Sequence, residues 1–222
     1  MSLSHSPKVV TDGLVLYLDA ANQRSYPKSG TTWSDLAGTN NGTLNNMEDN
    51  FDPAGKGSLT FDGTDEYVEL GTSITRYFVD ITISLWVYPL ISSGTQYLAS
   101  KYTYPNGWFI YYSGNKFGID GRVSAQQYIT NTSSDTYAIN NWYNVVFTRS
   151  TSNWRLYVNS ILQADNIWNN GTSQFITDAS FYIAKLNAVE SQLIVSDIKG
   201  YNRALTGDEV RQNYLATRGR YK

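Results

Sequence analysis

Apolar and polar residues alternate with a period of two through much of the chain, which is the pattern of half-buried β-strands. The clearest case is residues 81–89, where four aliphatic side chains point to one face. The opposite face of that segment carries Thr82, Ser84, Trp86 and Tyr88. Segments of similar pattern predict strands at residues 13–19, 58–62, 66–70, 97–101, 107–112, 116–120, 126–130, 144–149, 154–158, 175–184 and 192–201.

Turn residues separate these segments at intervals of about 8–12 residues, as in sandwiches and barrels. Gly114 with Asn115 is one tight-turn pair. Long helical segments between the strands are missing from the pattern. We therefore predict an all-β fold, a two-sheet antiparallel sandwich. Residues 20–57 are rich in turn residues, and Trp33 and Leu44 are expected to anchor them to the core.

One helix is predicted near the C-terminus. Thr206 and Glu209 have the capping-box spacing, and Val210 and Tyr214 begin an apolar stripe that Leu215 extends. Gly219 is the expected end. The chain shows no internal repeat or linker, so we predict a polar arm at residues 1–12 and one domain at residues 13–222.

Composition and charge narrow the range of partners that the chain could have. The 222 residues are 14% aromatic and 16% charged, with a formal net charge of -2. A nucleic-acid partner would call for a basic stripe, and the basic residues gather only near the C-terminus, where they suit a helix end. The chain has no cysteine, no apolar leader at its start and no run of about 18 apolar residues. We expect synthesis in a reducing cytoplasm and no membrane association.

Five segments in order resemble the laminin-G-like branch of the concanavalin A-like lectin/glucanase superfamily. They are residues 13–19, 58–68, 83–87, 141–147 and 198–206, the last leading into Glu209. The resemblance covers roughly residues 12–217. It implies a jelly roll of two curved antiparallel sheets, with a short helix after the final strand.

Residues 16–44 look like a version of this domain common in virion proteins of tailed bacteriophages and in some bacterial surface proteins. That resemblance implies a phage virion structural protein: a capsid decoration, fibre or adhesion module carried on the virion. Other virion subunits, docked through residues 1–12, and a host-surface glycan are the partners it suggests. The alternative is a stand-alone carbohydrate-binding module or a bacterial surface adhesin.

The chain offers few residues that could catalyse a reaction. Glycoside hydrolysis needs two carboxylates across one cleft, and the five glutamates lack the alternating arrangement of this fold's glucanases. Glu66 and Glu69 differ by three positions, so they point to opposite faces of a strand. The one histidine, His5, lies in the arm, and cysteine is absent. We expect no catalytic residues, no cofactor and no enzyme activity.

Calcium is the metal that the resemblance suggests, because it takes oxygen ligands. Asp62 and Asp65 match the first part of the family's site. The family's acidic pair before the final strand reads Ser196 and Asp197 here, which removes one carboxylate. The competing interpretation is that Asp62 caps its own turn. We assign no metal site.

Carbohydrate is the ligand we expect, since sugars dock their C–H faces on aromatic rings. Residues 101–108 form a loop-like stretch with three aromatics, and we name Tyr102, Tyr104 and Trp108 as the candidate ligand-binding residues. A second such stretch surrounds Trp168. The alternative is that these rings pack beneath loops or join copies of the chain in a homo-oligomer. Trp86 and Trp142 are assigned to packing.

Overall fold

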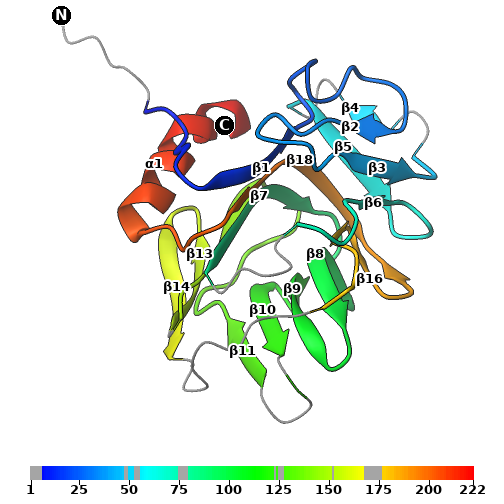
Figure 1. Ribbon diagram of the computed structural model, residues 1–222. Helices are drawn as coiled ribbons and strands as arrows, with labels where there is room; N and C mark the ends of the chain where they lie inside the picture. The colour runs from blue at the N-terminus through cyan, green and yellow to red at the C-terminus, as the bar shows by residue number, and fades with distance from the viewer. Residues whose placement is uncertain are drawn as a thin grey trace, which may run out of the picture.

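The computed structural model describes residues 7–47, 50–52, 56–74, 80–122, 124, 128–151, 153–167 and 177–222, which form two large antiparallel sheets packed face to face (Figure 1). The first sheet has the order β14-β13-β12-β7-β18-β5-β4, and β1 also pairs with β18. Its strands are β1 (Leu14–Asp19), β4 (Phe51–Asp52), β5 (Ser58–Asp62), β7 (Ile81–Pro89), β12 (Tyr143–Arg149), β13 (Asn153–Val158), β14 (Ile161–Ile167) and β18 (Gln192–Tyr201).

The second sheet has the order β11-β10-β9-β8-β15-β6-β3-β2. Its strands are β2 (Thr32–Trp33), β3 (Gly42–Asn45), β6 (Tyr67–Glu69), β8 (Thr95–Thr103), β9 (Asn106–Ser113), β10 (Lys116–Arg122), β11 (Tyr128–Thr132) and β15 (Tyr182–Ile183). A separate hairpin joins β16 (Lys185–Leu186) and β17 (Val189–Glu190). The predicted jelly-roll sandwich is confirmed.

The main core lies between the two sheets and is built by the alternation seen in the sequence. Ile81, Ile83, Leu85 and Val87 of β7 all enter it, each at most 1% exposed. Trp33 and Leu44 are buried at 0% and 3%, so they anchor residues 20–57 as predicted. The outward face of β7 is also covered, because the C-terminal helix lies on it (Figure 1).

That helix, α1 (Gly207–Thr217), begins as predicted at Thr206. Thr206 accepts from the Glu209 backbone N–H, and the Glu209 carboxylate accepts from the Thr206 backbone N–H. The chain continues past Thr217 as a 3-10 turn, η1 (Arg218–Tyr221), so Gly219 does not end the helical segment. Val210 and Leu205 join a smaller core between α1 and the first sheet.

The described part of the predicted arm packs against α1. Val10 is 8% exposed, its N–H donates to Asn213 at 2.8 Å, and its carbonyl accepts from the Tyr201 hydroxyl at 3.0 Å. Gln212 reaches the Lys8 carbonyl at 2.8 Å. Residues 8–10 thus pack on the domain through contacts made within the chain.

Several strands differ from the sequence expectation, and the short hairpin strands β16 and β17 lie outside every predicted segment. The strand expected at residues 175–184 is reduced to β15, its start lying outside the described residues. The pattern missed β14, because it is an edge strand whose exposed Ile161, Leu162 and Ile167 break the alternation. None of the helices in the described ranges is long and apolar enough to cross a membrane.

Candidate functional site

The three aromatic residues predicted to bind ligand are placed in three different environments. Trp108 is 1% exposed and lies in the main core, with its ring 5.3 Å from Phe181 and 6.2 Å from Phe147. The prediction for Trp108 is therefore wrong. The physical reason is strand alternation: residues 106–113 are strand β9 rather than loop, and Trp108 falls on its inward face.

Tyr102 and Tyr104 are accessible, but they do not stand together. Tyr104 lies in the turn after β8 and is 64% exposed. Tyr102 lies near the end of β8, half-buried, on the outward face of the second sheet. Its ring meets the edge of Phe109 at a centroid distance of 5.5 Å. Phe109 replaces Trp108 as the aromatic neighbour of Tyr102.

Phe109 is the centre of an aromatic surface that sequence reasoning missed. Tyr97 meets it edge-on at 5.5 Å, and Tyr111 lies 6.0 Å away. We call Tyr97, Tyr102, Phe109 and Tyr111 the aromatic platform; all four are half-buried on the outward face of β8 and β9. A signal was available: in the strand predicted at residues 107–112, Phe109 and Tyr111 alternate with Trp108 and Tyr112 and so share the face opposite to them.

A glycine fixes the position of Tyr111. A Cβ atom added at Gly118 of β10 would lie 2.2 Å from Cζ of the Tyr111 ring and 2.5 Å from its hydroxyl. The ring therefore lies across the backbone of β10, in space that any other residue would fill. Its hydroxyl reaches Thr132 of β11 at 3.4 Å.

A polar border lies beside the platform on β10 and β11. Asp120, 8% exposed, stands directly opposite Phe109. Its carboxylate accepts from the Thr130 hydroxyl at 3.0 Å and from Arg122 Nε at 3.4 Å. Asp120 is therefore the charged group next to the central ring of the platform.

The two tyrosine hydroxyls of the platform that flank Phe109 are held neutral. Burial raises the pKa of Tyr97, and the Asp120 carboxylate raises it further. Burial also raises the pKa of Tyr102, with Arg122 opposing and Asp120 adding to the shift. Neither hydroxyl has a hydrogen-bond partner within the described residues, so both can donate to or accept from a ligand.

The β16–β17 hairpin bounds the platform on its other side. Ser100 stands opposite Phe109 on β8 and is fully buried. Its hydroxyl donates to the Lys185 carbonyl of the hairpin at 2.6 Å. Lys185 pairs with Glu190 at 2.8 Å, and its Nζ lies 3.6 Å from the centroid of the Tyr67 ring. The Lys185 ammonium group thus already has two partners, the Glu190 carboxylate and the Tyr67 ring.

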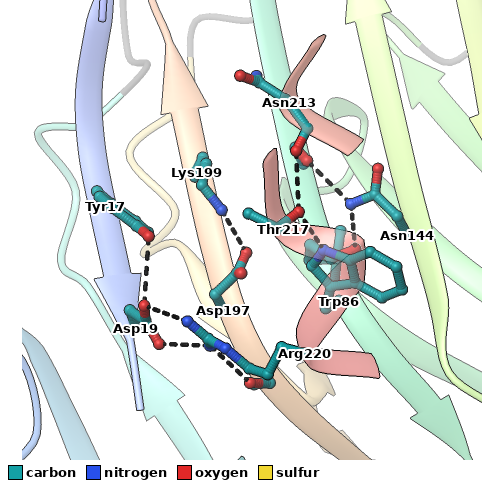
Figure 2. A network of polar contacts seen from close by, with 12 residues as sticks. Tyr17, Asp19, Trp86, Asn144, Asp197, Lys199, Asn213, Thr217 and Arg220 are labelled. Atoms are coloured by element: carbon teal, nitrogen blue, oxygen red, sulfur yellow. Dashed lines mark hydrogen bonds and ion pairs between the residues drawn. The ribbon is translucent and has the colours of Figure 1, made fainter. Parts of the chain in front are cut away.

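A second concentration of ionisable groups lies on the first sheet, under the C-terminal segment (Figure 2). The Arg220 guanidinium donates to both carboxylate oxygens of Asp19 at 2.7 and 2.9 Å, and Lys199 pairs with Asp197 at 2.7 Å. The Tyr221 hydroxyl lies 3.2 Å from Asp197. Asp197 and Lys199 are at most 2% exposed, so this network attaches η1 to the sheet and leaves no open binding surface.

The acidic residues of the calcium hypothesis do not come together in the structure. Asp62 is exposed and accepts the Thr64 N–H at 2.7 Å, which is the turn cap considered above. Asp62 pairs with Gln192 on β18, five residues from Asp197, which corresponds to about 16–17 Å along a strand. Among the described residues no group of three His, Cys, Asp or Glu could hold a metal ion. The second aromatic stretch, at Trp168, lies outside them.

The family model described as the concanavalin A-like lectin/glucanases superfamily, of laminin-G type, matches residues 62–211. No curated protein matches the sequence.

Solved structures share the fold at low identity. The receptor-binding domain of botulinum neurotoxin C/D mosaic serotype superposes with a TM-score of 0.71 at 13% identity, over 94% of this chain and 52% of that one. A botulinum neurotoxin type C structure, whose description names interaction with two ganglioside molecules, gives 0.70 at 15%, over 93% and 52%. Trypanosoma rangeli sialidase with the inhibitor DANA gives 0.68 at 19%, over 96% and 35%. The chain thus spans about half of the toxin chains and a third of the sialidase.

Proposed function

This chain belongs to the concanavalin A-like lectin/glucanase superfamily, and from that premise we propose that it is a carbohydrate-binding domain. The observation that carries the proposal is the aromatic platform beside Asp120. It combines half-exposed rings, two phenolic hydroxyls without partners in the described chain, and a bordering carboxylate.

Sugars present two kinds of surface, and the platform matches both. The C–H faces of a pyranose ring pack on aromatic faces, while its hydroxyls need donors and acceptors at the edges. Tyr97 and Tyr102 supply hydroxyls that donate and accept, and the Asp120 carboxylate supplies acceptors. A carboxylate forms stronger hydrogen bonds to hydroxyls than a neutral acceptor does. An apolar partner alone would leave these polar groups without a role.

The structural neighbours support the same class of ligand. The type C toxin is described by its dependence on gangliosides, which carry oligosaccharides, and the sialidase by its complex with an inhibitor. At identities of 15% and 19%, these neighbours support only the class of ligand, carbohydrate, and no particular sugar.

The proposal is binding without turnover. Glycoside hydrolysis uses two carboxylates no more than about 9.5 Å apart. Asp120 and Glu69 lie on strands four places apart in the sheet, a separation of about 19 Å at the usual strand spacing. Glu69 also accepts the Ser180 hydroxyl at 2.6 Å, and Glu190 is paired with Lys185. A reducing-sugar assay on polysaccharides tests this part; release of reducing ends would refute it.

The setting of the domain is a separate proposal that rests on the sequence alone. The likeness of residues 16–44 to phage virion proteins favours display on a particle, as a decoration, fibre or adhesion module. A stand-alone binding module or a bacterial adhesin is the alternative. Mass spectrometry of purified particles decides between them, because the virion proposal requires the protein to be present there.

A glycan array tests the binding proposal. We expect the wild-type domain to bind a subset of glycans, and Tyr97→Ala and Tyr102→Ala each to weaken that binding by about tenfold, the loss of roughly one aromatic contact. Tyr88→Ala is the matched control, because Tyr88 is also a half-buried strand tyrosine but lies on the first sheet, against Trp142. An equal loss of binding in Tyr88→Ala, or no glycan binding at all, would overturn the proposal.

A further inference from the structure

The charge distribution around the platform restricts the sugars it can hold. Asp120 stands directly opposite Phe109 in the ladder between β9 and β10, and directly opposed side chains have Cβ atoms about 5 Å apart. Arg122 stands opposite Gly107, two residues further toward the end of the strands. The Asp120 carboxylate, 11% exposed, is thus the charged group directly beside the Phe109 ring, and the guanidinium paired with it, 28% exposed, lies farther along the strands.

The cations near this face are already engaged. Arg122 Nε is bonded to Asp120, so an acidic ligand would have to compete with that carboxylate. Lys185 is paired with Glu190 across the hairpin. Lys116, at the start of β10, donates to the carbonyls of Ser133 and Ser134 at 3.1 and 3.4 Å. Among the described residues, each cation that faces the platform from these elements thus has a partner within the chain.

From this arrangement we infer that the platform selects neutral glycans and rejects acidic ones, with Asp120 as the specificity-determining residue. The inference rests on the proposed carbohydrate-binding function and goes beyond it. It runs against the simplest extrapolation from the structural neighbours, whose descriptions name gangliosides and a sialidase inhibitor. The hydroxyls of a neutral sugar satisfy Asp120, whereas a carboxylate on the ligand places a second negative charge beside it. Like charges brought together at a binding surface are a common means of excluding a partner.

Matched pairs of probes make the test sharp. Lactose and sialyllactose, and other neutral oligosaccharides with their sialylated or uronate-containing forms, are compared by array and then by calorimetry. We expect the wild-type domain to bind the neutral member of each bound pair about tenfold more tightly. Asp120→Asn keeps the size of the side chain and removes the negative charge beside the platform, so this ratio should fall by at least about fivefold.

Asp165→Asn is the matched control. Asp165 is also a strand aspartate bonded to an arginine Nε, that of Arg155 at 3.1 Å, but it lies on β14 of the other sheet. The substitution changes net charge by the same amount and should leave the ratio unchanged. Ionic strength gives a second measurement that needs no variant: screening should improve binding of the acidic members and barely affect the neutral ones.

The outcomes separate the two proposals. Binding of neutral glycans with an unchanged ratio in Asp120→Asn overturns the inference and leaves the carbohydrate-binding function standing. Tighter binding of acidic members by the wild-type domain overturns it in the same way. If neither member of any pair binds, the proposed function itself fails.

Discussion

The ion pair between Arg220 and Asp19 gives the most direct test of how the C-terminal segment is held. The guanidinium meets the carboxylate through two hydrogen bonds of 2.7 and 2.9 Å, and the Asp19 side chain is only 5% exposed. Asp197, 0% exposed, lies next to it and is balanced by Lys199. Arg220→Ala leaves two buried carboxylates with a single cation between them.

The expected cost follows from burial. Breaking a buried pair by removing one partner costs about 3–5 kcal/mol, because the remaining charge is left without compensation. The Arg220 side chain is 29% exposed, so water can partly replace it, and we expect a loss of about 2–3 kcal/mol. In a chain of this length that corresponds to a fall in Tm of roughly 5–10 °C.

The dependence on pH has a defined sign. Burial alone would raise the pKa of Asp19, but the hydrogen bonds and charge of Arg220 outweigh it, and the pKa is lowered. A carboxyl group whose folded pKa is depressed stabilises the fold above its unfolded value of about 4, and this stabilisation is lost as the pH falls through the folded pKa. The difference between wild type and Arg220→Ala should therefore be largest near pH 7 and shrink in acid.

Urea denaturation followed by tryptophan fluorescence at pH 7 and about pH 3 measures both effects. Arg211→Ala is the control, since Arg211 is exposed on α1, and it should change stability by less than about 0.5 kcal/mol. A loss in Arg220→Ala no greater than that of the control would refute the reasoning. So would a loss that is equally large at both pH values.

Three further substitutions test other parts of the structure. Thr206→Ala removes the oxygen that accepts the Glu209 N–H at 3.3 Å and should cost about 1 kcal/mol in urea denaturation. Trp108→Ala empties a core position that is 1% exposed and should cost about 3–5 kcal/mol. Gly118→Ala places a Cβ 2.2 Å from the Tyr111 ring, so the ring must move, and affinity for a neutral oligosaccharide should fall about fivefold.

Each of these has an outcome that contradicts it. Full stability in Trp108→Ala together with lost glycan binding would return that residue to the binding site. Unchanged affinity in Gly118→Ala would mean that the Tyr111 ring does not contribute to ligand binding. A Thr206→Ala variant as stable as wild type would mean that the capping box adds nothing to the attachment of α1.

The class of fold and much of the order of its elements follow from local patterns in the amino-acid sequence. Period-two alternation fixes which face of β7 enters the core, because successive side chains in a strand must point to opposite sides. The capping-box residues Thr206 and Glu209 fix where α1 begins, since their hydrogen bonds are local. Trp33 could be assigned to the core from its isolation in a polar stretch, and it is 0% exposed.

The candidate binding surface depends on how the strands pair in the folded chain. The loop-like stretch predicted at residues 101–108 overlaps the strand predicted at residues 107–112, and Trp108 falls in the overlap. In the structure Trp108 belongs to strand β9, which turns its ring into the core. The platform brings Tyr97, Phe109 and Asp120 together from three strands, and only the register of β8, β9 and β10 makes them neighbours. Local pattern fixes which way a side chain points along its own strand. Strand pairing fixes what lies beside it, because pairing depends on contacts between residues distant in the chain.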